Sequence, residues 1–300
     1  MNSLPLSVPS GRALVLGGGG SAGNAWLIGI VAGLDAAGLE VTDAELMVGT
    51  SAGSTAAAQL AGRDPRALLA DILATPVPAV DRRPAPGRPG ASQLERTNAV
   101  IAASTDVVDM RRRMGSAFLE HVDPTAGERW RATVAARLPV TEWPARRLLI
   151  TAVDAQTGDP VVFDRQSGVS LVDAVAASCA GGAAHSIGER SYIDGGYRTN
   201  ADNADLASGC ARVLVLSPLG GRTRLPAEWG LRLADQVAAL RAEGSLVETV
   251  FPDEDSLSAF GGNMMDLAAR APAARAGAAQ GEAIAARLAE FWGSPSRTVK

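Results

Sequence analysis

Two glycine-rich segments combine residue types that suit acyl-transfer chemistry. Residues 49–53 spell Gly-Thr-Ser-Ala-Gly, which places Ser51 in a Gly-x-Ser-x-Gly pattern between a short apolar run and a helical segment. A serine in this context sits exposed on a sharp strand-to-helix turn and can act as a nucleophile. Residues 17–23 begin with four consecutive glycines, whose backbone N–H groups can point at one spot and hold a developing oxyanion. Together the segments predict a serine hydrolase.

Ser21 is a rival nucleophile, because residues 19–23 also fit Gly-x-Ser-x-Gly. The glycines that precede Ser21 suit N–H donation better than they suit a single constrained turn. We therefore favour Ser51 as the nucleophile and keep Ser21 as the alternative.

The base that activates the serine must come from another part of the chain. The chain holds only two histidines, His121 and His185. We expect His121 to be a surface or cap residue, whereas His185 lies in a glycine-rich loop and is a candidate for contact with the substrate. Asp194 is the stronger base candidate, because the two glycines that follow it permit a tight turn that exposes the carboxylate. The same tripeptide is also common as a plain hairpin turn.

The first glycine segment has a competing interpretation. Gly18, Gly20 and Gly23 fit the Gly-x-Gly-x-x-Gly dinucleotide fingerprint, and Glu40 or Asp43 lies near the spacing for a ribose-binding acid. This pattern predicts an oxidoreductase with a nucleotide cofactor. Such a domain has no need of a second glycine turn around a serine, so the hydrolase interpretation is favoured.

Strands and helices must alternate to position these turns. Apolar runs at residues 13–16, 45–48 and 212–217 predict buried parallel strands, and residues 148–163 predict a hairpin. Helices are expected at residues 22–37, 92–103, 107–119, 126–138 and 171–178, and again from residue 226 onward. The alternation predicts a mostly parallel sheet with helices on both faces.

Composition excludes several classes of function. The chain has 300 residues, a net charge of −4 and a single lysine, Lys300, which excludes a P-loop lysine and an internal Schiff base. No His-Glu-x-x-His or Cys-x-x-Cys spacing occurs, so we expect no metal site and no cofactor. The slightly negative net charge predicts no basic surface that would bind nucleic acid.

The sequence contains neither a signal peptide pattern nor a run of 18 apolar residues. We therefore expect a cytoplasmic protein whose contact with a membrane, if there is any, is peripheral. Residues 76–90 are rich in proline and glycine and are either a cap over the site or a flexible connection.

The motifs, in their order along residues 13–200, resemble those of the patatin-like phospholipases. The resemblance rests on the glycine loop, the turn around Ser51, the Ala-Ala-Ser stretch that ends at Ser178, and Asp194-Gly-Gly. It implies a three-layer α/β/α sandwich with a mostly parallel sheet. It also implies a dyad of Ser51 and Asp194, with the backbone N–H groups of four residues as the oxyanion hole: Gly18, Gly19, Gly20 and Ala52.

The resemblance further implies one domain over residues 1–300, with a core at about 11–220 and a C-terminal helical part at about 226–295. The expected activity is hydrolysis of fatty-acyl esters, with phospholipids among the candidate substrates. The chain departs from the family where Ser21 and Ala22 replace a frequent arginine, and where residues 179–185 lack prolines. These departures leave the dyad intact and the substrate open. A lipid-binding protein of the same fold without turnover is the third hypothesis.

Overall fold

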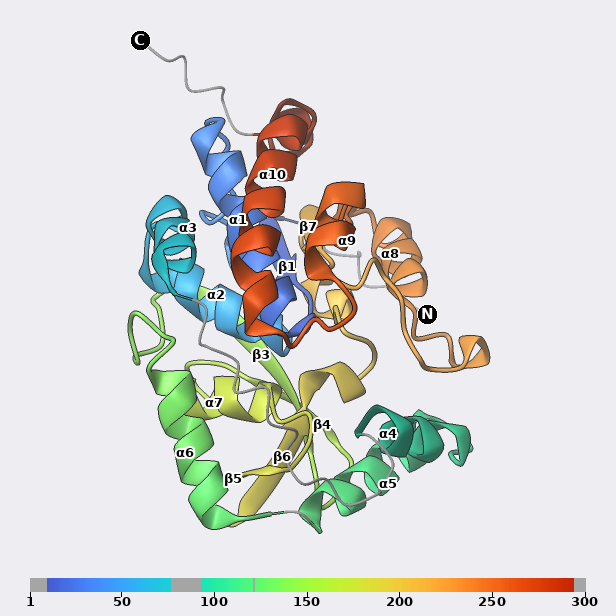
Figure 1. The fold of residues 1–300 in the computed structure, drawn as a ribbon. Coiled ribbons are helices and arrows are strands. Elements are labelled where there is room, and N and C mark those ends of the chain that lie inside the picture. The colour runs from blue at the N-terminus through green and yellow to red at the C-terminus, as the bar shows by residue number, and fades with distance from the viewer. Residues whose placement is uncertain (1–9, 77–92, 121, 294–300) are drawn as a thin grey trace.

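A computed structural model describes residues 10–76, 93–120 and 122–293, which form an eight-stranded sheet with helices on both faces (Figure 1). The strands are β1 (Arg12–Leu16), β2 (Leu46–Gly49), β3 (Arg147–Asp154), β4 (Pro160–Phe163), β5 (His185–Ile187), β6 (Arg190–Asp194), β7 (Arg212–Leu216) and β8 (Leu246–Val250). The helices are α1 (Gly20–Ala36), α2 (Ala52–Gly62), α3 (Pro65–Ala74), α4 (Gln93–Ala102), α5 (Val107–Leu119), α6 (Pro124–Ala135), α7 (Leu171–Ser178), α8 (Leu233–Ala242), α9 (Glu254–Phe260) and α10 (Arg270–Trp292).

The strand order is β5-β6-β3-β2-β1-β7-β8, with β4 also paired to β3. The five strands from β3 to β8 in this order run parallel, whereas β4 and β6 pair with β3 in the antiparallel sense. The prediction of a mostly parallel sheet with a β3–β4 hairpin is therefore confirmed.

Alternating side chains of the central strands build two core layers, one on each face of the sheet. On β1, Leu14 and Leu16 pack into the larger core with α1, α2, α7 and α10. Ala13 and Val15 face the opposite side and pack with α8 and the 204–207 turn. These two cores give the three-layer α/β/α sandwich that the sequence predicts.

The first and last helices of the sandwich touch through their backbones. Figure 1 shows α10 alongside α1. A Cβ atom on Gly29 would lie 2.2 Å from the carbonyl oxygen of Ala274, and one on Gly281 would lie 2.4 Å from the carbonyl oxygen of Ile30. Because only glycine permits this approach, the α1–α10 contact depends on it. It leaves α1 buried on all sides along most of its length.

The C-terminal part also holds a strand that the sequence does not predict, because β8 extends the sheet beside β7. Glu248 and Thr249 interrupt the apolar pattern of this strand, which lies at the sheet edge and is half-buried there. Of the sequence features discussed above, residues 77–90 of the proline-rich segment and His121 lie outside the described residues.

Candidate active site

Ser51 occupies the sharp turn between β2 and α2. Its backbone has φ +52° and ψ −119°, a conformation that is uncommon for a residue with a side chain. Non-glycine residues held in such regions cost on the order of 1–3 kcal/mol and persist only where the surrounding structure fixes them. The turn is therefore a strained one, as expected for a nucleophile presented on an elbow.

Both glycines of the 49–53 motif are required by close backbone contacts. A Cβ atom on Gly49 would lie 2.6 Å from the Cα of Ser54, and one on Gly53 would lie 1.9 Å from the carbonyl oxygen of Leu16. The chain thus doubles back so tightly around Ser51 that a side chain at either position would collide with backbone. This explains in physical terms why the serine stands between two glycines.

Hydrogen bonds hold the Ser51 backbone from two sides. Its N–H donates to the hydroxyl of Ser178, at the end of α7, over 2.9 Å. Its carbonyl oxygen accepts from the hydroxyl of Ser54 over 2.7 Å. These contacts compensate for the unusual backbone geometry and leave the Ser51 side chain available.

The register of β3 with its two neighbours determines how close Asp194 comes to Ser51. Gly49, at the end of β2, pairs with Ile150, so the chain continues from there toward the level of Ala152. β4 pairs with residues 150–153 along one edge of β3, so β2 and β6 share the other edge, where Asp194 at the end of the antiparallel strand β6 pairs with Ala152. Two strands that run in opposite directions therefore deliver the serine and the aspartate to the same place.

The carboxylate of Asp194 accepts a hydrogen bond from the backbone N–H of Gly196 over 2.8 Å, and the Ser51 side chain lies close enough to stabilise its charged form. Burial raises the pKa of Asp194 to about 6, although the interactions with Gly196 and Ser51 act to lower it. A carboxylate with a pKa in this range is ionised at neutral pH and is a stronger base than free aspartate.

The glycine loop lines the same cavity as Ser51 and Asp194. Gly18 donates its N–H to the carbonyl oxygen of Ala201 over 2.8 Å, which anchors the loop. Gly20, with φ +63°, is the first residue of α1, and Ala52 is the first residue of α2. The N–H groups at the start of a helix have no acceptor within the helix and carry a partial positive charge.

The cavity that Ser51 and Asp194 line has a volume of about 570 Å³. Its walls come from segments far apart in the sequence and are largely apolar, with two arginines on one of them. The wall residues include Ile101, Tyr197, Leu219, Arg222, Arg224, Leu225, Met264 and Met265. Sequence patterns missed these residues, because none carries a motif and only the fold gathers them around Ser51.

Two other candidates from the sequence lie elsewhere. Ser21 is in the first turn of α1, where its carbonyl oxygen accepts a hydrogen bond from Arg270 over 3.2 Å. His185 is on β5 rather than in a loop, and its Nε2 lies 3.4 Å from a carboxylate oxygen of Asp173. The described lining of the Ser51 cavity includes neither residue.

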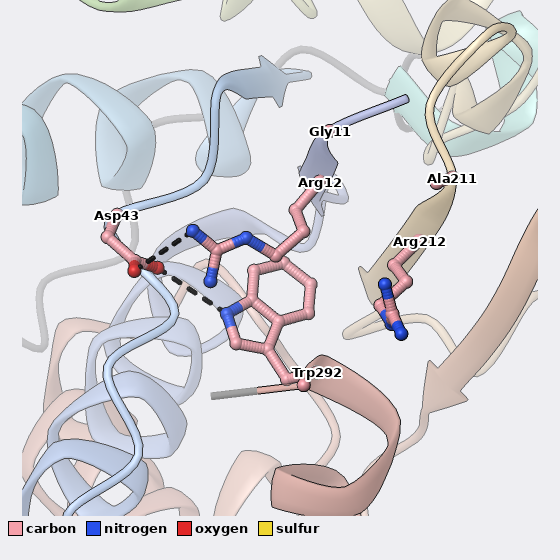
Figure 2. A pocket seen from close by; sticks show the side chains of 7 residues that line it. Gly11, Arg12, Asp43, Ala211, Arg212 and Trp292 are labelled. Carbon is pink, nitrogen blue, oxygen red and sulfur yellow. Dashed lines mark hydrogen bonds and ion pairs between the residues drawn. The ribbon is translucent and has the colours of Figure 1, made fainter. Parts of the chain in front are cut away.

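A second cavity, of about 390 Å³, lies at the opposite end of the sheet, where β1 and β7 begin (Figure 2). Asp43 forms an ion pair with Arg12 at 3.0 Å and accepts a hydrogen bond from Trp292. Asp43 therefore lies at the opposite end of the strands from the glycine loop, too far away to bind a ribose beside that loop. The Nε of Arg212 donates to the carbonyl oxygen of Phe291, so these polar groups tie the end of α10 to the sheet.

Within the described part of the chain, no group of three or more His, Cys, Asp and Glu side chains is arranged to hold a metal ion. Of the helices in that part, none combines the length and apolar character needed to cross a membrane.

The chain is similar to a known family and to a distant solved structure. No curated protein matches the chain. The crystal structure of the type III effector protein ExoU matches at 18% identity and a TM-score of 0.33, over 91% of this chain and 54% of that one, so this chain spans about half of its length. The family model described as patatin-like phospholipase matches residues 14–207. Because this match covers more than half of the chain and includes both Ser51 and Asp194, the protein belongs to the patatin-like phospholipase family.

Proposed function

We propose that this protein is a serine acyl hydrolase that cleaves fatty-acyl esters, with phospholipids among its substrates, through Ser51 and Asp194. The observation that carries the proposal is that Ser51 and Asp194 line one cavity together with the glycine loop, with the two side chains close enough to interact. Membership of the patatin-like phospholipase family supports the class of reaction.

In the acylation step, the Ser51 Oγ attacks the ester carbonyl carbon while its proton passes to Asp194. The negative charge that develops on the carbonyl oxygen is held by the N–H groups of Gly19, Gly20 and Ala52, near the two helix N-termini. The N–H of Gly18, which already donates to Ala201, keeps the loop in shape. Protonated Asp194 then gives its proton to the departing alcohol, and an acyl-enzyme remains.

In the deacylation step, Asp194 takes a proton from a water molecule that attacks the acyl-enzyme. The carbon–oxygen bond to Ser51 breaks, and the serine recovers the proton. One carboxylate thus serves as base and acid in turn, which suits a pKa raised by burial to about 6. The largely apolar walls of the cavity suit the acyl chain.

The test is hydrolysis of p-nitrophenyl esters from acetyl to palmitoyl by the parent, Ser51→Ala and Ser21→Ala. We expect Ser51→Ala to lose all turnover and Ser21→Ala to keep it, since only Ser51 faces Asp194. Loss in Ser21→Ala alone would reject the proposed nucleophile. Three inert proteins that still bind lipid vesicles would instead favour a lipid-binding protein without turnover.

A further inference from the structure

Asn203 is a fully buried side chain that lies beneath the turn that carries Ser51. Its backbone is left-handed, with φ +52° and ψ +42°, a conformation that asparagine adopts more readily than most residues. It follows the Asp194 turn by nine positions and belongs to none of the motifs that the sequence displays. Its side-chain hydrogen bonds nevertheless link the turn that carries Ser51 to the turn that carries Asp194.

The side-chain amide nitrogen of Asn203 reaches the immediate neighbours of both dyad residues. It donates to the hydroxyl of Thr50, which precedes Ser51, over 3.0 Å. It also donates to the carbonyl oxygen of Gly195, which follows Asp194, over 3.0 Å. One amide group is therefore bonded to the nucleophile turn and to the aspartate turn at the same time.

The strand between these turns completes the arrangement. The hydroxyl of Thr151, on β3, donates to the hydroxyl of Thr50 over 3.0 Å and lies 3.5 Å from the Asn203 nitrogen. A Cβ atom on Gly195 would lie 2.1 Å from that same Thr151 hydroxyl. The Asp194 turn thus packs directly against Thr151, and the hydrogen bond from Asn203 to Gly195 holds it in that position.

The other end of the Asn203 amide is fixed as well. Its oxygen accepts hydrogen bonds from the Arg198 guanidinium over 3.0 Å and from the hydroxyl of Thr199 over 2.7 Å. These partners determine which end of the amide faces the dyad, because a guanidinium can only donate. The nitrogen must therefore point at Thr50 and Gly195.

We propose that Asn203 is a positioning residue for the reaction, which sets the approach of Ser51 to Asp194 by holding Thr50 and Gly195 together. The inference rests on the proposed hydrolase function. The physical reason is that a proton passes between two groups only within hydrogen-bond reach, and a misplacement of about 1 Å can cost about 100-fold in rate. Asn203 touches neither dyad side chain, so it acts through their neighbours.

The experiment compares Asn203→Gly and Asn203→Asp with the parent. Glycine keeps the left-handed backbone and removes the amide, whereas aspartate keeps the shape but replaces the donor with an acceptor. We expect kcat to fall about 100-fold in both variants with KM within about twofold of the parent, because substrate contacts are retained. The rate at which a fluorophosphonate probe labels Ser51 should fall in parallel with kcat.

Ser256→Ala is the matched control for lost stability. Ser256 is also fully buried, and its hydroxyl accepts from Trp26 and donates to Gln280, away from the dyad. We expect this variant to lower Tm while leaving kcat and the labelling rate unchanged. Folded Asn203→Gly that turns over and is labelled at the parental rates would overturn the inference.

Thr50→Val tests the same hydrogen bond if the Asn203 variants do not fold. It keeps the side-chain shape and removes the hydroxyl that accepts from Asn203, so kcat should fall by about tenfold or more. Parental kcat in Thr50→Val would count against the inference. A parent that is inert toward esters and is labelled no faster than Ser51→Ala would overturn the hydrolase proposal, and the positioning role with it.

Discussion

The backbone N–H of Ser51 is held by the hydroxyl of Ser178, 2.9 Å away and 127 positions further along the chain. Ser178 is the last residue of α7, and the chain runs from there through β5 and β6 to Asp194. One continuous segment therefore supports the Ser51 turn at its start and carries Asp194, the proposed base, at its end. Any shift of this segment moves both members of the proposed dyad.

We expect Ser178→Ala to lower kcat by about tenfold, because the strained Ser51 turn loses the hydroxyl that accepts from its N–H. Steady-state kinetics on a short-chain ester measures the effect. Ser170→Ala is the control: it removes the N-cap of the same helix, where the Ser170 hydroxyl accepts from the Asp173 N–H. That change should cost about 1 kcal/mol of stability and leave kcat unaltered. Equal kcat losses in both variants would contradict a specific role for Ser178.

The pH dependence of hydrolysis should report the ionisation of Asp194. Because burial raises its pKa to about 6, kcat/KM is expected to be level near pH 8 and to fall below about pH 6, where the carboxylate is protonated and cannot accept the serine proton. Asp194→Asn should lose about 10² to 10⁴-fold in kcat. A level profile from pH 5 to 8 in the parent would be incompatible with Asp194 as the base.

A methyl group at Gly53 should prevent the nucleophile turn from forming. The added Cβ would lie 1.9 Å from the carbonyl oxygen of Leu16, and neither backbone can yield easily. We expect Gly53→Ala to lose about 1–3 kcal/mol or more in the free energy of unfolding and to lose ester hydrolysis. Gly127→Ala, on α6 with open space around it, should gain up to about 1 kcal/mol. Urea unfolding distinguishes the two, and a stabilised Gly53→Ala would refute the argument.

The buried carboxyl of Asp202 should make the free energy of unfolding depend on pH in an unusual way. It is buried against Gly17, near the Ser217 side chain, and its Oδ1 has no partner among the described residues. Burial raises its pKa to about 7, whereas an unfolded aspartate titrates near about 3.9. Between about pH 4 and 7 the folded state holds the extra proton, so the free energy of unfolding must fall as pH rises through that window.

Asp202→Asn should flatten this dependence and make the variant more stable than the parent at pH 8. Urea titrations at several pH values from 5 to 8 provide the measurement. Asp194→Asn is the companion variant: its carboxyl, with a pKa raised to about 6, affects stability over a lower range, about pH 4 to 6. Parallel curves of unfolding free energy against pH for the parent and Asp202→Asn would show that Asp202 does not cause the pH dependence.

Local sequence was sufficient to predict the turns and most of the elements around them. The glycines that flank Ser51, the apolar run that became β1 and the hairpin of β3 and β4 are all encoded within a few neighbouring residues. Their alternation predicted a mostly parallel sheet with helices on both faces, and the family resemblance implied the three-layer α/β/α sandwich. Such features depend on backbone sterics and on side-chain period, which a single segment determines by itself.

Relationships between distant segments could not be derived from local sequence patterns, and only the family resemblance implied the pairing of Ser51 with Asp194. The approach of Asp194 to Ser51 depends on the antiparallel register of β6 against β3. The placement of Asn203 depends on a left-handed backbone and on side-chain partners from three separate segments. β5 and β8 were missed because an edge or short strand carries a weak apolar pattern. In each case the arrangement is stabilised by contacts that form only when distant parts of the chain fold together.

The α1–α10 contact has a consequence for the order in which the molecule assembles. α1 is apolar around most of its circumference, and its partner is the last helix of the described chain. During synthesis α1 emerges early and cannot be covered until α10 has left the ribosome, so its apolar surface remains available to chaperones or to other chains in the interval. The β1–β7 pairing closes a loop of similar length, and loops of this kind make folding slow. The rate of refolding, more than the final stability, should therefore limit how much active protein a cell obtains.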